Sequence, residues 1–242
     1  MDCYKKFAAV YDIFMARDIP YDAWAAYIDD TLGGKPAIVL DLACGTGNMT
    51  LRLAERGYDM IGADASEDML AQAQNKAFDQ GYRILWLLQD MRRLDLYGTV
   101  DAVTCVCDGL NYIIKPDELW EVFRRVRLFL NPGGIFIFDM NTEYKFKEIL
   151  AEGTFGDAAE GAEYQWDNRY DAETKINEYR LSFSPAEQSP LVYKERHLQR
   201  AYDIGAVSNW LMDAGFASVR LRDNYTHQPP KADTTRVTFI SC

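Results

Sequence analysis

The chain has 242 residues, 48% of them hydrophobic and 26% charged, a composition typical of a globular protein with one large core. No apolar run approaches the roughly 20 residues that a membrane-spanning helix needs, and residues 1–18 lack the continuous apolar stretch of a secretory signal. The net charge of −11, without a dense cluster of Lys or Arg, argues against nucleic acid as a partner. We therefore expect a cytoplasmic protein.

The first 32 residues predict two helices on either side of Pro20, rich in aromatic residues that could cover a ligand. Five short apolar runs then alternate with helical segments between residues 37 and 140. Such alternation is typical of a parallel sheet with helices on both faces, and right-handed crossovers make it doubly wound. We expect an α/β, Rossmann-like fold, with helices at Asn48–Glu55, Ser66–Phe78 and Pro116–Leu130, the last ended by an NPGG turn.

Strand-like alternation from about residue 161 to 201 predicts an antiparallel meander inserted after the fifth core strand. A helix from Asp203 to Ala214 and two last strands, SVRLRD and RVTFIS, should complete the chain. We expect a single domain with four parts: a helical cap (1–32), a cofactor-binding core (33–150), a meander lid (155–201) and a C-terminal part (202–242).

The cysteines form no zinc-type pair of CxxC motifs, and we expect them to be buried, reduced thiols. They are Cys3, Cys44, Cys105, Cys107 and Cys242. No metal site is expected.

The stretch VLDLACGTGNMT, residues 39–50, runs from a strand through Gly45-Thr46-Gly47 into a helix, which leaves backbone N–H groups free at a positive helix end. The dinucleotide fingerprint GxGxxG would require a third glycine where Thr50 stands, and Asp41 lies four residues before the first glycine. A NAD-dependent dehydrogenase is therefore only an alternative.

Polar residues follow each of the next three strands. Asp64 could accept hydrogen bonds from both hydroxyls of a ribose. Asp90 could accept from an exocyclic amino group, the Met91 backbone could contact a ring nitrogen, and Met69 and Met91 could form apolar walls for a flat base. Ligands of open α/β sheets bind at the carboxyl ends of the strands, and the fourth strand places there Cys107, Asp108, Asn111 and Tyr112.

In order, the motifs VLDLACGTGN, IGADASEDML, LQDMR, DAVTCVCDGLNY and LNPGGIFIFDMN resemble those of the class I S-adenosylmethionine-dependent methyltransferases. Within that family the chain resembles the bacterial small-molecule branch that includes sugar-amine N-methyltransferases. The resemblance implies a seven-stranded sheet with six parallel strands and an antiparallel last strand. It also implies S-adenosylmethionine as the cofactor, methyl transfer to a small polar acceptor, and residues 161–201 as a lid over that acceptor.

Carried over by position, the resemblance implies that the loop from Ala43 to Gly47 wraps the methionine moiety. Asp41 would order this loop and the cofactor's ammonium, and Tyr11 would close over the cofactor. Cys44 should act through its backbone and not its sulfur. The expected cofactor residues are Tyr11, Asp41, Ala43, Cys44, Gly45, Gly47, Asp64, Ala65, Met69, Asp90, Met91 and Cys107.

Methyl transfer from a sulfonium is an in-line displacement, which requires alignment and the exclusion of water and needs no nucleophilic side chain. An amine acceptor must be neutral and a hydroxyl acceptor must lose its proton, so a base can help. His197 is the first candidate for that base, although it could simply pack in a strand. Asp108 and Tyr112 could orient an amine. Arg200 could pair with an anionic substrate, but a solvated charge is the favoured interpretation.

A cofactor-binding module that has lost catalysis and acts through a partner is a further alternative. RNA or protein methylation is a weaker variant, since the acidic charge disfavours RNA. The sequence identifies neither the acceptor nor its reacting atom, and it allows a monomer or a homodimer.

Overall fold

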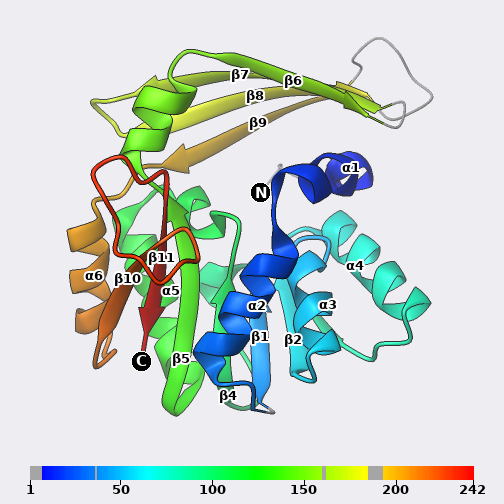
Figure 1. Ribbon diagram of the computed structural model, residues 1–242, viewed down its shortest axis with the longest axis vertical. Coiled ribbons are helices and arrows are strands. Elements are labelled where there is room, and N and C mark those ends of the chain that lie inside the picture. Colours follow the sequence, from blue (N-terminus) through cyan, green and yellow to red (C-terminus); the bar gives the residue numbers. More distant parts are fainter. Residues whose placement is uncertain (1–6, 36, 160–161, 185–192) are drawn as a thin grey trace.

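The computed structural model describes residues 7–35, 37–159, 162–184 and 193–242 (Figure 1). Cys3 lies outside the described residues. A core sheet with helices forms one part of the molecule, and a second sheet lies across one edge of this core (Figure 1). No helix of the described segments combines the length and the apolar character needed to cross a bilayer.

The core sheet has seven strands in the order β10-β11-β5-β4-β1-β2-β3. They are β1 (Ile38–Leu42), β2 (Asp59–Asp64), β3 (Leu85–Leu88), β4 (Val100–Cys105), β5 (Leu130–Asn141), β10 (Val219–Asp223) and β11 (Arg236–Ser241). β1 pairs in parallel with β2 and β4, β2 with β3, and β4 with β5, whereas β11 is antiparallel to both β5 and β10. Six strands share one direction and the last strand of the chain opposes them, which confirms the predicted sheet.

Helices cover both faces of this sheet. They are α2 (Tyr21–Leu32), α3 (Asn48–Glu55), α4 (Glu67–Asp79), α5 (Pro116–Phe129) and α6 (Ile204–Asp213). Val39 and Leu40 are consecutive in β1 and fully buried, and they point to opposite faces. Val39 belongs to the apolar cluster formed with α2 and α3, and Leu40 to the cluster formed with α5 and α6. The doubly wound arrangement follows from these two separate cores.

The predicted NPGG turn is wrong as a separate element, because these residues lie inside the long strand β5. β5 pairs with β4 on both sides of an irregularity, Val100 with Leu130 and Ala102 with Ile135. Gly133 has a φ of +76°, and a Cβ at Gly134 would stand 2.9 Å from two backbone oxygens. The two glycines therefore allow the strand to bend here while it keeps its partner.

The second sheet, called the lid, has four antiparallel strands in the order β6-β7-β8-β9, which confirms the predicted meander. They are β6 (Thr154–Ala159), β7 (Ala162–Asp171), β8 (Ile176–Ser184) and β9 (Tyr193–Arg200). The lid begins earlier than residue 161, and a short π-helix, η3 (Lys145–Leu150), connects it to β5. β5 ends at this connection, so the carboxyl ends of the parallel core strands face the lid.

The first helix, α1 (Ala8–Asp18), lies between the lid and the core (Figure 1). Phe7 and Phe14 share an apolar cluster with Leu181 and Phe183 of β8. The rings of Phe7 and Phe183 meet edge to face with centroids 5.1 Å apart. Phe7 and Phe14 therefore pack the first part of the cap against the lid, whereas Tyr21, Trp24 and Tyr27 of α2 belong to an apolar cluster of the core.

Candidate active site

A cavity lies at the carboxyl ends of β1, β2, β3 and β4, where the sequence predicts the cofactor. Nine of the twelve expected cofactor residues line it: Tyr11, Ala43, Gly45, Asp64, Ala65, Met69, Asp90, Met91 and Cys107. Gln89, Val106, Gly109 and the predicted catalytic Tyr112 complete the lining. Residues from five separate segments of the chain thus meet at one edge of the sheet.

The glycine loop exposes its backbone to this cavity. Ala43, Gly45 and Gly47 all have positive φ, at +56°, +54° and +77°. No atom lies within 4 Å of the place where a Cβ of Gly45 would stand, so a ligand can approach the main chain. A Cβ at Gly47 would instead stand 2.9 Å from the ring of Trp86, so Gly47 permits close packing of the loop against the sheet.

Asp41, Cys44 and Gly47 are not among the residues that line the cavity; they shape the loop from behind. Asp41 is fully buried and accepts hydrogen bonds from the hydroxyls of Thr50 (2.5 Å) and Thr104 (2.9 Å). Burial raises the pKa of Asp41 to about 6, against the opposing effect of the two hydroxyls. Burial also raises the pKa of the Cys44 thiol, which makes the thiol unreactive.

Asp64 joins the glycine loop to the start of α4. Its carboxylate accepts hydrogen bonds from the backbone N–H groups of Gly45 and Ser66, both at 2.8 Å, and it lines the cavity. Burial raises the pKa of Asp64, and these N–H donors partly oppose the shift. A carboxylate offers about four acceptor positions, so Asp64 retains capacity for ligand hydroxyls.

Asp90 lies on the cavity wall with its carboxylate engaged by Arg92. The Arg92 side chain contacts both Asp90 oxygens, and this contact lowers the Asp90 pKa. Part of the hydrogen-bond acceptor capacity of Asp90, which was expected to serve the adenine amino group, is therefore used by Arg92. Met69 and Met91 line the same cavity and are buried, in agreement with an apolar wall for a planar base.

These residues fit S-adenosylmethionine: an open backbone loop, a carboxylate held at the second strand end, and two methionine side chains face one cavity. The loop suits the amino-acid part of the cofactor, and Asp64 suits a ribose.

A second cavity of about 350 Å³ lies between the core and the lid, and it shares Tyr11, Cys107 and Tyr112 with the first. Aromatic and apolar side chains from α1 and the lid form much of its wall. Its polar lining includes Asp108, Lys145, His197, Gln199 and Arg236. A cavity of this size accommodates a small molecule beside the cofactor.

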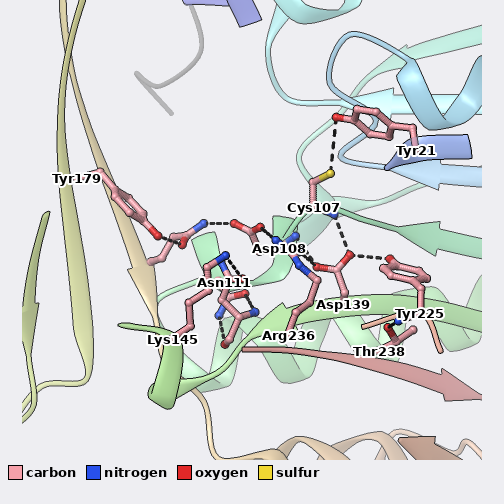
Figure 2. A network of polar contacts seen from close by, with 12 residues as sticks. Tyr21, Cys107, Asp108, Asn111, Asp139, Lys145, Tyr179, Tyr225, Arg236 and Thr238 are labelled. Atoms are coloured by element: carbon pink, nitrogen blue, oxygen red, sulfur yellow. Dashed lines mark hydrogen bonds and ion pairs between the residues drawn. The ribbon is translucent and has the colours of Figure 1, made fainter. Parts of the chain in front are cut away.

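Asp139 is the centre of a polar network beneath this second cavity (Figure 2). It is fully buried and accepts hydrogen bonds from the backbone N–H groups of Cys107 and Asp108, both at 2.8 Å, and from the Tyr225 hydroxyl at 2.6 Å. Arg236 is ion-paired with both Asp139 and Asp108. Cys107 and Asp108 have positive φ, and these bonds hold that strained backbone in place.

The lid reaches this network through β9. Gln199 donates a hydrogen bond of 2.5 Å to Asp108 and accepts one of 2.9 Å from the Tyr179 hydroxyl (Figure 2). Two residues earlier on the same face of β9, the His197 ring lies 3.2 Å from the Tyr112 hydroxyl through Nδ1 and 3.2 Å from Glu195 through Nε2. All three predicted catalytic residues, Asp108, Tyr112 and His197, therefore line one cavity.

Asn111 and Arg200 have other roles. Asn111 is buried and bonded to the backbone of Asn141 and Arg200, so it ties η2 (Gly109–Tyr112) to β5 and β9. The Arg200 guanidinium lies over the Tyr202 ring, 5.6 Å from its centroid. Arg200 is half-buried against this ring, and its interpretation as a solvated charge stays a prediction.

The sequence interpretation did not assign Asp139, Lys145, Glu195, Gln199 or Arg236. Asp139 ends the apolar run GIFIFD, two residues before the end of β5, and an acidic residue after such a run is a signal that is visible in the sequence. Glu195, His197 and Gln199 have the two-residue spacing of one strand face, a signal that is visible in the sequence. Nothing in the local sequence of Lys145 or Arg236 indicates burial.

Among the described cysteines Cys44, Cys105, Cys107 and Cys242 are free. Burial raises the pKa of both Cys105 and Cys107. The expectation of burial is wrong for Cys242, which is exposed.

Comparison with known proteins gives concordant results. A family model described as a methyltransferase domain matches residues 39–134. YqeM of Bacillus subtilis, which is assigned to the methyltransferases without a stated substrate, is 36% identical over 238 residues, covering 98% of this chain and 95% of YqeM.

Solved structures share the architecture. An S-adenosylmethionine-dependent methyltransferase from Clostridium acetobutylicum is 30% identical, with a TM-score of 0.87 over 99% of this chain and 98% of that chain. The sugar N-methyltransferase KedS8 from Streptoalloteichus has the same fold at 22% identity, with a TM-score of 0.76 over 96% of this chain and 91% of its own. The chain therefore belongs to the class I S-adenosylmethionine-dependent methyltransferases.

Proposed function

We propose that this methyltransferase acts on a nitrogen or oxygen atom of a small polar molecule bound in the second cavity. The observation that carries the proposal is the shared wall of the two cavities, formed by Tyr11, Cys107 and Tyr112. An acceptor there would lie next to the cofactor and under the lid, so that alignment and exclusion of water follow from binding. The sugar N-methyltransferase KedS8, which has the same fold, supports nitrogen as one of the two acceptor atoms.

S-adenosylmethionine supplies an activated methyl group, and a base of the chain can assist by accepting the proton that an amine or hydroxyl releases. Tyr112 lines both cavities, and its hydroxyl contacts His197. We assign His197 as the base that takes this proton, directly or through Tyr112. The Glu195 side chain is 6% exposed and lies at the other ring nitrogen, where it would fix the tautomer of His197 and stabilise the charged ring.

Asp108 has the role of orienting the acceptor. Its oxygens are held by Arg236 at 2.8 Å and by Gln199 at 2.5 Å, so the carboxylate is fixed before a ligand binds. A fixed, charged hydrogen-bond acceptor can direct an N–H or O–H group of the substrate by a charge-assisted hydrogen bond.

A small molecule as the methyl acceptor, a cytoplasmic location and a monomeric or homodimeric state all stay predictions.

The test is incubation of the purified full-length chain with methyl-labelled S-adenosylmethionine and a metabolite extract, followed by identification of labelled products. We expect one small N- or O-methylated product. A protein that binds the cofactor and leaves every metabolite unlabelled would be a binding module without catalysis.

Once the acceptor is identified, His197→Gln should lower kcat by about 10²-fold or more, because the glutamine amide cannot assist as a base. Steady-state kinetics measure this, with cofactor affinity and melting temperature as checks on folding. Lys194→Ala is the matched control, since Lys194 is exposed on the opposite face of β9. Equal kcat values for wild type and His197→Gln would show that His197 only packs.

A further inference from the structure

Lys145 is a charged side chain of the second cavity to which the proposed reaction assigns no role. It begins η3, directly after β5, and lines the cavity. Its ammonium donates a hydrogen bond of 2.9 Å to Asn141 Oδ1, and it forms no ion pair with the described residues. An ammonium has three N–H donors, so Lys145 has donors left for a ligand.

Asn141, which accepts the hydrogen bond from this ammonium, is itself held in place. The backbone of Asn141 is bonded in both directions to the side chain of Asn111, at 2.9 and 3.2 Å, and both residues are buried. Burial lowers the pKa of Lys145, while Asp108 and Asp139 act in the opposite direction. The Lys145 ammonium is therefore held in one orientation and has lost part of its solvation by water. Binding of an anionic ligand can offset this loss.

The nearby carboxylates are already engaged. Asp108 and Asp139 are both ion-paired with Arg236, and Asp108 also accepts from Gln199. Asp18 is an exposed residue of the cavity lining, on α1. The two carboxylates Asp108 and Asp139 are balanced by the two cations Arg236 and Lys145, and Asp18 is an additional carboxylate at the exposed side of the lining. The inner part of the cavity is therefore close to neutral in a chain of net charge −11.

From this placement we infer that the methyl acceptor carries an anionic oxygen group, a carboxylate or a phosphate, and that Lys145 binds this group and selects the substrate. The inference rests on the proposed function, because it takes the second cavity as the acceptor site. Asp108 and Tyr112 would face the reacting nitrogen or oxygen, while Lys145 holds the anionic end.

The inference is tested without turnover. The protein is first loaded with the demethylated cofactor, and acetate or inorganic phosphate is then added in separate titrations at constant ionic strength. Tryptophan fluorescence reports binding, because Trp166 lines the cavity. We expect saturable binding of at least one anion, weakened about 10-fold or more in Lys145→Met and largely restored in Lys145→Arg. The anion that binds better identifies the group as carboxylate or phosphate. Absence of binding to wild type, or equal binding to Lys145→Met, would overturn the inference.

Lys147→Met is the matched control, because Lys147 belongs to the same helix, is 59% exposed and pairs only with Glu148 among the described residues. It should bind the anions as wild type does. With the labelled extract, the methylated product should be retained on an anion exchanger. Lys145→Met should raise the KM for the methyl acceptor, with little change in kcat or in cofactor affinity. Anion binding in a protein that methylates nothing would refute the proposed function, whereas a labelled product without negative charge would refute the role of Lys145.

Discussion

Asp64 connects cofactor recognition to the shape of the loop that wraps the cofactor. Its two oxygens accept from Gly45 and Ser66, so the residue expected to hold the ribose also fixes the glycine loop and the start of α4. Cys44, inside the same loop, is buried with a raised pKa, in agreement with the expectation that its backbone and not its sulfur matters. At the scale of single residues, the loop depends on backbone geometry and one carboxylate.

Asp64→Asn should weaken S-adenosylmethionine binding by about 1–3 kcal/mol, because the amide loses the charge and presents an N–H to one of the two backbone donors. Titration calorimetry measures the change. Asp68→Asn, which alters an exposed carboxylate in the first turn of α4, should bind normally. Because burial raises the pKa of Asp64, wild-type affinity should fall on acidification at a higher pH than for an ordinary aspartate. Unchanged affinity in Asp64→Asn would remove the ribose assignment.

The cap, the core loop and the lid form one connected unit at the scale of elements. Asp12 of α1 accepts hydrogen bonds from Thr46 (2.6 Å), Asn48 (2.8 Å) and Lys76 (2.6 Å), which ties the cap to the glycine loop and to α4. The other side of α1 packs on the lid through Phe7 and Phe14. Tyr11, the neighbour of Asp12, lines both cavities, so its position depends on these contacts.

Asp12→Ala should weaken cofactor binding about tenfold, since it releases the cap and leaves the half-buried ammonium of Lys76 without its carboxylate. Burial already lowers the pKa of Lys76, and loss of Asp12 should lower it further. Calorimetry of binding and of unfolding separates the two effects. Asp22→Ala is the control, because it removes an exposed ion pair between Asp22 of α2 and Arg52 of α3. Equal cofactor affinity in the two variants would mean that the cap plays no part in binding.

The lid contributes polar side chains to the second cavity as well as cover. One face of β9 carries Glu195, His197 and Gln199: His197 contacts Tyr112, Gln199 contacts Asp108, and Glu195 contacts the His197 ring. The strand period of two places all three side chains on the same side. Opening the lid would therefore withdraw the proposed base and release the orienting carboxylate at the same time.

The free energy of unfolding of the whole molecule should depend on pH through the titration of Asp41. Its pKa is about 6 in the folded protein, above the value near 3.9 of an unfolded chain. Between pH 4 and 6 the folded state therefore binds more protons, and the free energy of unfolding should decrease as pH rises through this window. Two pKa units correspond to about 3 kcal/mol.

Asp41→Asn should remove this dependence, since the amide does not titrate and can still bond to Thr50 and Thr104. Chemical unfolding at pH 4, 5, 6 and 7 would show the wild type losing up to about 3 kcal/mol relative to the variant. Parallel curves for the two proteins would mean that Asp41 titrates normally.

Local sequence patterns predicted the core sheet and its helices, because the periodicity of apolar residues is a property of neighbours in the chain. They also placed the cofactor cavity, since each parallel strand brings its carboxyl end to one edge, where Asp64 and Met91 lie. The bend inside β5 was not predictable, because the chain pairs with β4 on both sides of two glycines that otherwise indicate a turn.

The sequence by itself therefore determined the fold, the cofactor and the strand ends at which the first cavity lies. Only the tertiary structure decided what lies opposite those ends: the contact of His197 with Tyr112, the pairing of Arg236 with Asp108 and Asp139, and the position of Lys145 in the second cavity. These contacts join residues separated by up to 128 positions in the chain. Their physical cause is the packing of the lid and the last strand on the core, which local patterns do not encode.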